Sequence, residues 1–76
     1  YPKDGSYTSS LFTIGEDEIL KKIGEESVEV ILAAKSQGSE RLVAESADLL
    51  YHLIVLLVEK GLTLQDVEQE LKRRRN

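Results

Sequence analysis

The sequence predicts an all-α protein, with an antiparallel hairpin of two long helices followed by a shorter C-terminal helix, in a single domain over residues 1–76. Apolar residues recur at helical spacing near residues 16–35, 40–60 and 64–71. Helix-starting residues precede these segments, and a glycine follows each of the first two. A chain of 76 residues has a marginal core as a lone monomer, so we expect a second copy to complete a helical bundle.

Residues 1–9 are polar and rich in turn-forming residues, and Ser6 is suited to cap a short helix through Leu11 and Phe12. Spacing alone favours a tether whose aromatic side chains pack on the bundle. The alternative is a lip that carries hydroxyl and lysine groups over a phosphate site. Because the chain opens at Tyr1-Pro2 without methionine, we expect that an N-terminal piece has been removed or left out.

The first long helix is expected to begin at Thr13-Ile14-Gly15-Glu16, which has the Thr-x-x-Glu form of a capping box, and to run to about Lys35. Acidic residues 16–18 fill its first turn, where the helix dipole favours negative charge. Glu26 falls at the border of its main apolar stripe, which comprises Leu20, Ile23, Val30, Ile31 and Ala34.

The second helix is expected over about Glu40 to Lys60, after a stop at Gly38 and an N-cap at Ser39. It is the most apolar element of the chain and has only a narrow polar stripe, formed by Arg41, Glu45, Asp48 and His52. A helix that is apolar nearly all round must be buried nearly all round. Two further helices from one chain cannot achieve this, so we predict a homodimer.

The third helix is expected to open at Thr63-Leu64-Gln65-Asp66, after Gly61 has ended the second. It includes Leu71 and carries the basic residues 72–75 at its C-terminal end. Cationic side chains there complement the helix dipole, and that account suffices for most of them.

Two pairs of carboxylates flank the turn of the hairpin: Glu26 with Glu29, and Glu45 with Asp48. Residues three apart share one face of a helix. If the helices fold back around Gln37, Glu26 faces Asp48 and Glu29 faces Glu45. Four carboxylates in one layer repel one another unless a cation or shared protons offset the charge. Hard oxygen ligands without a thiol favour Mg²⁺, or Mn²⁺, over zinc.

A lone Glu-x-x-Glu pair is weak evidence for a site, because surface helices contain many solvated acidic pairs. Two pairs at mirrored levels around one turn are harder to explain by chance. The second pair also lies in the most apolar helix, where an unpaired carboxylate would be costly or would shift its pKa. Metal binding is therefore the favoured interpretation.

Lys22 and His52 are expected at one level of the hairpin, beside the acids. His52 is suited to contact a phosphate or to orient a carboxylate, although a lone histidine is more often a hydrogen-bonded core residue. Lys22 is suited to bind a phosphate, with a simple salt bridge to an acid as its alternative role.

The composition narrows the class of protein and its partners. A formal net charge of -4 gives no general attraction to nucleic acid. The apolar run 49–58 is too short to span a bilayer, which argues against a membrane protein. The chain has no cysteine and no visible signal peptide, so a cytoplasmic location is expected.

The paired acids resemble the metal motif of the all-α nucleoside-triphosphate pyrophosphohydrolase superfamily, the MazG-like enzymes. More specific sequence motifs resemble the phosphoribosyl-ATP pyrophosphohydrolase family of histidine biosynthesis. These motifs are Gly5-Ser6-Tyr7-Thr8, Lys21-Lys22-Ile23-Gly24-Glu25-Glu26 and Glu45-Ser46-Ala47-Asp48-Leu49-Leu50-Tyr51-His52-Leu53. The resemblance is strong over residues 5–71. Family members usually carry a further short N-terminal helix, which fits a trimmed start.

The resemblance implies Mg²⁺-dependent hydrolysis of phosphoribosyl-ATP to phosphoribosyl-AMP and pyrophosphate. The metal ligands it implies are Glu26, Glu29, Glu45 and Asp48. A spare carboxylate, Glu25 or Glu29, would orient or deprotonate the attacking water. The implied phosphate or phosphoribosyl contacts are Lys22, Lys3, Ser6, Tyr7 and His52.

Two other functions fit the same sequence. A housecleaning nucleoside-triphosphate pyrophosphohydrolase of the same superfamily would share the acids and differ in substrate. A non-catalytic helical dimerisation module would carry the acidic pairs incidentally. The sequence also fits both a free-standing enzyme and the C-terminal part of a bifunctional chain.

Overall fold

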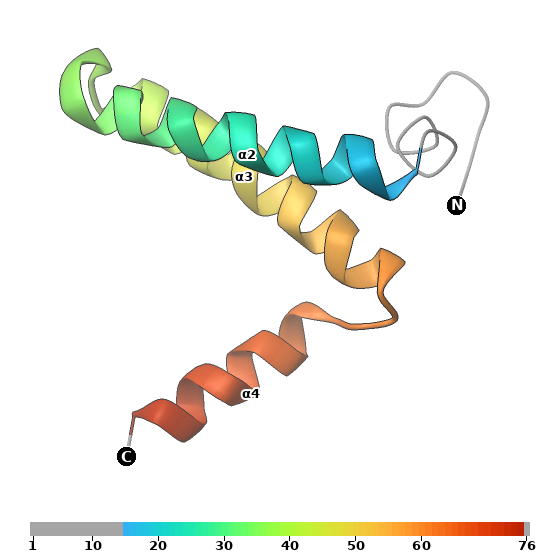
Figure 1. Ribbon diagram of the computed structural model, residues 1–76. Coiled ribbons are helices and arrows are strands. Elements are labelled where there is room, and N and C mark those ends of the chain that lie inside the picture. The colour runs from blue at the N-terminus through green and yellow to red at the C-terminus, as the bar shows by residue number, and fades with distance from the viewer. Residues whose placement is uncertain (1–14, 76) are drawn as a thin grey trace.

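The computed structural model describes residues 15–75, which form a helical hairpin and a third helix that extends away from it (Figure 1). The hairpin consists of α2 (Glu16–Leu32), a π-helical turn η1 (Ala33–Gln37) and α3 (Ser39–Glu59), and α4 (Leu64–Arg74) follows. The predicted all-α class is confirmed for this part of the chain. The short helix expected from Ser6 lies outside the described residues.

The core of the hairpin is a seam between α2 and α3, which run antiparallel side by side (Figure 1). Ile19 is fully buried against Val55, and Ile23 and Leu56 pack around them. At the open end of the hairpin, Lys60 Nζ lies 2.6 Å from Glu16 Oε1. This hydrogen bond to the Glu16 carboxylate raises the pKa of Lys60 above its ordinary value.

The seam uses only part of the stripe expected on the first long helix. Ile23 of that stripe packs on the core, whereas Leu20 and Ile31 are exposed, Ile31 by 64%. Ile19 and Ala33, which were not in the expected stripe, are buried. The helix has apolar residues on more than one side, and α3 covers one of them in a single chain. The predicted stripe therefore forms the α2–α3 contact only in part, and the rest of it remains on the surface.

Glycines set the boundaries of the two long helices. Gly15 precedes α2 with φ 104° and ψ -173°, and Gly38 precedes α3 with φ 90° and ψ 170°. Neither helix has a side-chain cap at its N-terminus. The expected N-caps are therefore wrong: Ser39 is the first residue of α3, and Thr13 lies before Gly15, outside the described residues. Backbone at these angles is accessible essentially to glycine alone, so the helices begin immediately after it.

We expect Gly38→Ala to destabilise the protein by about 1–3 kcal/mol, because alanine at φ 90° and ψ 170° is strained. A Cβ at Gly38 would meet nothing within 4 Å, so the cost is conformational and not a clash. Gly24 is the matched control, since it lies within α2 and its Cβ would also meet nothing within 4 Å. Gly24→Ala should stabilise by roughly 0.5–1 kcal/mol. Urea unfolding of both variants measures this, and equal effects would contradict the backbone account.

The third helix begins where the sequence predicts, and a capping box between Thr63 and Asp66 closes its first turn. The Asp66 backbone N–H donates to Thr63 Oγ1 at 3.2 Å, and the Thr63 N–H donates to Asp66 Oδ2 at 2.9 Å. Near its C-terminal end Arg74 Nε donates to Glu70 at 2.9 Å, and Arg73 also pairs with Glu70. These arginine hydrogen bonds hold the pKa of Glu70 below its ordinary value of 4.5.

Acidification should therefore weaken α4 through Glu70. A carboxyl whose pKa is lowered on folding contributes stability above its unfolded pKa, and this contribution is lost as the pH falls through the folded pKa. We expect the helical circular dichroism of the wild type to fall more on acidification below about pH 4.5 than that of Glu70→Gln. Identical curves would mean that the arginine pairs contribute nothing measurable. The pairs are exposed, so the difference should be small and should shrink with salt.

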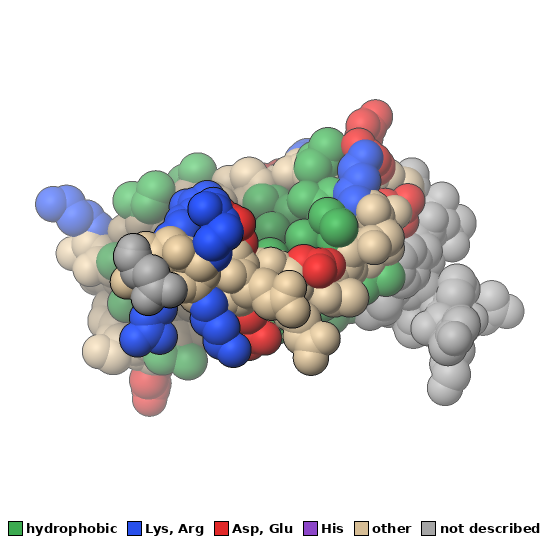
Figure 2. All heavy atoms as spheres, turned by 90° about the horizontal axis from the view of Figure 1, so that it is seen from below, with side chains coloured by type: hydrophobic (Ala, Val, Ile, Leu, Met, Phe, Trp, Pro, Cys, Tyr) green, Lys and Arg blue, Asp and Glu red, His purple; other side chains and the backbone are tan. Residues whose placement is uncertain are grey.

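The surface of the single chain is unusually apolar. On α3, the side opposite the seam carries an apolar row that we name the outer face of α3, comprising Val43, Ala47, Leu50, Ile54 and Val58. Val43 is 69% exposed, and Leu50 and Val58 are also exposed. Figure 2 shows apolar side chains open to solvent beside the Lys and Arg side chains. None of the described helices has the length and apolar character needed to cross a membrane.

Candidate functional site

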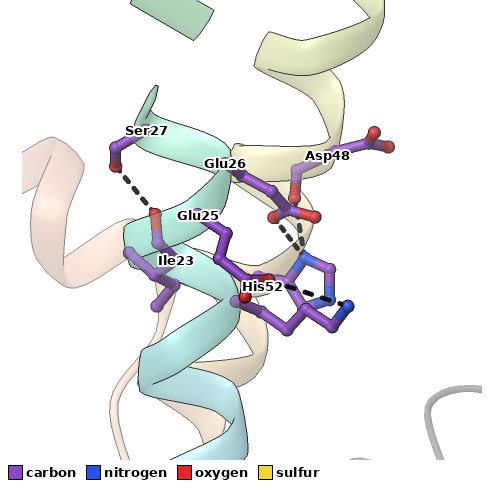
Figure 3. Close-up of polar contacts among 7 residues, drawn as sticks. Ile23, Glu25, Glu26, Ser27, Asp48 and His52 are labelled. Carbon is purple, nitrogen blue, oxygen red and sulfur yellow. Dashed lines mark hydrogen bonds and ion pairs between the residues drawn. The ribbon is translucent and has the colours of Figure 1, made fainter. Parts of the chain in front are cut away.

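A hydrogen bond between Glu26 and His52 joins α2 to α3 at the middle of the hairpin (Figure 3). His52 Nδ1 lies 2.5 Å from Glu26 Oε1, and the two side chains are 5% and 15% exposed. The same nitrogen lies 3.0 Å from the backbone oxygen of Asp48, one turn earlier in α3. A carboxylate this buried is costly without a partner, so the pair accounts for the position of Glu26 in the interface.

Glu45 is the second nearly buried carboxylate of the hairpin. Its side chain is 10% exposed, and it pairs with Arg41, one turn earlier in α3. Arg41 is more than half exposed, so its guanidinium reaches the carboxylate from the solvent side. The sequence placed Arg41 on the polar stripe without giving it a role. Its spacing of four residues from Glu45 is the pattern that would have identified the pair.

The remaining predicted acids are more open to solvent. Asp48 is exposed, and Figure 3 shows its carboxylate pointing away from the His52 ring while its backbone oxygen points toward it. Glu29 is half-buried on α2, one turn beyond Glu26. Glu25 is exposed and lies 4.0 Å from Lys22 Nζ.

The register of the hairpin fits the expected one at its core, where Ile19 packs against Val55 and both lie equally far along the chain from Gln37. The partner of His52 was not expected. Lys22 was expected to face His52, but His52 bonds to Glu26, one helical turn further along α2. The His52 ring lies toward Asp48, one turn earlier in α3, and so reaches the level of Glu26.

The four predicted metal ligands are suitable in chemistry but are not gathered into a cage. Over residues 15–75, no three Asp, Glu or His side chains come together in a way that could hold a metal ion. Glu26 and Glu45 are instead paired with His52 and Arg41. The donors themselves suit Mg²⁺ or Mn²⁺, because these ions prefer carboxylate oxygens, and Glu26 and Glu45 lie nearly buried on the two facing helices. Lys3, Ser6 and Tyr7, the predicted substrate contacts of the N-terminal segment, lie outside the described residues.

Fold and site together define an all-α protein whose helical hairpin holds acidic side chains at its interface. The sequence model of the phosphoribosyl-ATP pyrophosphohydrolase family matches residues 2–75. This match covers nearly the whole chain. The protein therefore belongs to the phosphoribosyl-ATP pyrophosphohydrolase family.

Individual relatives agree with this assignment. The chain is 63% identical over 73 residues to a phosphoribosyl-ATP pyrophosphatase of Limosilactobacillus fermentum, covering 96% of this chain and 69% of that protein. It is 57% identical over 74 residues to one of Clostridium botulinum, covering 97% of this chain and 67% of the relative. It is also 55% identical over 73 residues to the histidine biosynthesis bifunctional protein HisIE of Caldanaerobacter subterraneus, covering 96% of this chain and 36% of that protein.

Proposed function

We propose that this chain hydrolyses phosphoribosyl-ATP to phosphoribosyl-AMP and pyrophosphate, using the acids of the α2–α3 hairpin. Family membership over residues 2–75 carries the proposal and makes the chain a hydrolase of histidine biosynthesis. The structure supports the location, because two carboxylates, Glu26 and Glu45, are nearly buried between or beside the two helices. Buried acids are expensive to maintain for stability alone.

A divalent cation, Mg²⁺ or Mn²⁺, is part of this proposal. The residues that would hold it are Glu26, Glu29, Glu45 and Asp48, whose oxygens are the ligands such ions prefer. When bound, the cation would offset the negative charge of the phosphates and make a water molecule more acidic. Glu45 would then exchange Arg41 at one or both carboxylate oxygens, whereas Glu26 has a second oxygen that His52 does not contact.

The chain's other charged residues have complementary roles. Glu25 is exposed and Glu29 half-buried, so either is accessible to orient the attacking water or accept its proton. Lys22, beside Glu25, would neutralise phosphate charge. Lys3, Ser6 and Tyr7 remain predicted substrate contacts. Little covalent chemistry is required of the protein in phosphoryl transfer, so positioning and charge supply most of the rate.

The homodimer belongs to the same proposal. The outer face of α3 leaves Val43, Leu50 and Val58 exposed on the most apolar helix of the chain. An apolar row of this length on one helix is typical of a protein–protein interface. A second copy would cover it and complete the bundle. We place the enzyme in the cytoplasm, since the chain has no cysteine and its proposed substrate derives from ATP.

The test is pyrophosphate release from phosphoribosyl-ATP with and without Mg²⁺, beside a panel of ordinary nucleoside triphosphates. We expect Mg²⁺-dependent release from phosphoribosyl-ATP and little from the others. Activity confined to the ordinary triphosphates would contradict the substrate and favour the housecleaning function. The melting temperature offers a second measurement, because a cation that binds the folded state stabilises it by mass action. No release and no stabilisation would favour a non-catalytic dimerisation module.

A further inference from the structure

The position of hydrogen on the His52 ring follows from the two atoms that Nδ1 contacts. Nδ1 lies 3.0 Å from the Asp48 backbone oxygen and 2.5 Å from Glu26 Oε1. A backbone carbonyl can only accept a hydrogen bond, and so can an ionised carboxylate. Nδ1 must therefore carry hydrogen and donate it to both oxygens.

The orientation of this donor is set within α3. The Asp48 carbonyl belongs to the helix backbone one turn before His52. The Tyr51 ring lies edge-on to the imidazole, with centroids 5.1 Å apart and planes at 80°. Glu26 comes from the other helix, and its longer side chain has more rotational freedom in the absence of a partner. The imidazole is thus the fixed group of the pair, and the Glu26 carboxylate is the group that it orients (Figure 3).

We propose that His52 is a positioning residue for Glu26 and makes no direct contact with the substrate. Its Nδ1–H holds Oε1 of Glu26 and so directs the other carboxylate oxygen to the divalent cation. This inference rests on the proposed function, in which Glu26 is a ligand of that cation. It replaces the substrate contact expected of His52 from the family resemblance, because a side chain only 5% exposed has little surface to offer a substrate. Nearby cations are engaged elsewhere: Arg41 pairs with Glu45, and Lys22 lies by Glu25.

Removing the partner that orients a metal ligand typically lowers metal affinity about 10- to 100-fold. We therefore expect His52→Phe, which fills the space but cannot donate, to weaken Mn²⁺ binding by about 10- to 100-fold. His52→Asn should retain most of the affinity, because its side-chain N–H can occupy roughly the position of Nδ1–H. The free energy of unfolding should show the opposite order, with His52→Phe more stable than His52→Asn. Asparagine leaves space in a buried site that phenylalanine fills.

The first measurement needs no metal and no substrate. His52 is the single histidine of the 76-residue sequence, so ¹⁵N-labelled histidine gives one set of ring signals by NMR. We expect Nδ1 to carry hydrogen in the wild type, with the resonance of that hydrogen shifted in Glu26→Gln, whose amide oxygen is a weaker acceptor. A bare Nδ1 would overturn the proposal at once.

The second measurement is Mn²⁺ binding by calorimetry, together with kcat and KM for phosphoribosyl-ATP. Glu70→Gln is the control, because it changes an acid on α4 with no contact to the hairpin pair. The proposal is supported if His52→Phe loses Mn²⁺ affinity while His52→Asn retains it. It is overturned if the variant with the lower free energy of unfolding is also the one with the weaker Mn²⁺ binding. That result would make His52 a structural residue. It is also overturned if His52→Phe raises KM with unchanged Mn²⁺ affinity, which would indicate a direct substrate contact.

These experiments distinguish a failure of the proposed function from a failure of the positioning role of His52. A wild type that neither binds Mn²⁺ nor hydrolyses phosphoribosyl-ATP refutes the proposed function, and the role of His52 toward that cation is refuted with it. A wild type that does both, beside a His52→Phe variant that matches it, leaves the proposed function intact and overturns only the positioning role.

Discussion

Glu26→Gln is expected to lower the hydrolysis of phosphoribosyl-ATP by about 10³-fold while the helices remain formed. Metal ions contribute several kcal/mol of charge stabilisation in such sites, and about 4 kcal/mol corresponds to a thousandfold in rate. The amide keeps the shape of Glu26 and still accepts a hydrogen bond from His52, so folding should change little. Steady-state kcat/KM and far-ultraviolet circular dichroism measure the two effects. We expect the same result for Asp48→Asn.

Glu70→Gln makes the same chemical change on α4, at a carboxylate paired with Arg73 and Arg74. It should leave kcat/KM at the wild-type value, which excludes a general effect of removing one negative charge. Wild-type turnover in the Glu26 or Asp48 variant would refute the assignment of that residue to the metal site. Loss of helical structure in Glu26→Gln would instead make the assay uninformative about chemistry, and Asp48→Asn, at an exposed residue, is then the decisive variant.

Leu50→Lys is expected to convert the proposed homodimer into monomers. Leu50 lies at the middle of the outer face of α3, with Val43 on one side and Val58 on the other. An unpaired charge in a desolvated interface costs about 3–5 kcal/mol, which raises the dissociation constant roughly 10²- to 10⁴-fold. Analytical ultracentrifugation over a range of concentrations measures the constant. The melting temperature should fall as well, because folding and association of a chain with so small a core are coupled.

Gln37→Lys is the matched control, since it adds the same charge at an exposed residue of η1, away from the outer face of α3. It should dissociate like the wild type. A wild type that sediments as a monomer at all concentrations would contradict the homodimer. A dimeric Leu50→Lys variant would place the interface on another surface, such as the exposed apolar residues of α2.

Much of the fold follows from short-range features of the sequence. The three helices were predictable because each depends on neighbouring residues, through apolar spacing and a glycine stop. The capping box at Thr63 is equally local, a hydroxyl three residues before an acid, but only the helix start was predicted there. The start of α2 was misplaced for an equally local reason. Thr13 and Glu16 fit a capping pattern, but Gly15 between them adopts a conformation that ends the pattern.

The features that the sequence left open depend on how the helices pack. Apolar residues on several sides of α2 left its contact stripe undecided, and α3 selected Ile19 and Ala33 over Leu20 and Ile31. Of the four predicted acids, Glu26 and Glu45 are nearly buried at the hairpin, whereas Asp48 is exposed, and the partners of the two buried acids were not predicted. The pairing of His52 with Glu26 depends on the direction of the His52 side chain, whose ring lies toward Asp48, one turn earlier in α3. Whether the four acids converge on a cation remains a prediction for the experiments above.

The Glu26–His52 pair implies a conflict between thermal stability and activity in this hairpin. Both residues occupy the seam, where helical spacing would otherwise favour leucine, and Glu45 is nearly as buried. Replacing both members of a buried hydrogen-bonded pair with apolar side chains of the same shape can be nearly neutral or stabilising. Selection for thermal stability alone would therefore tend to replace both residues with aliphatic ones. The resulting protein would be more stable but inactive. Attempts to engineer a more robust form should hold Glu26 and His52 fixed and seek stability at Gly24 or on the surface of α4.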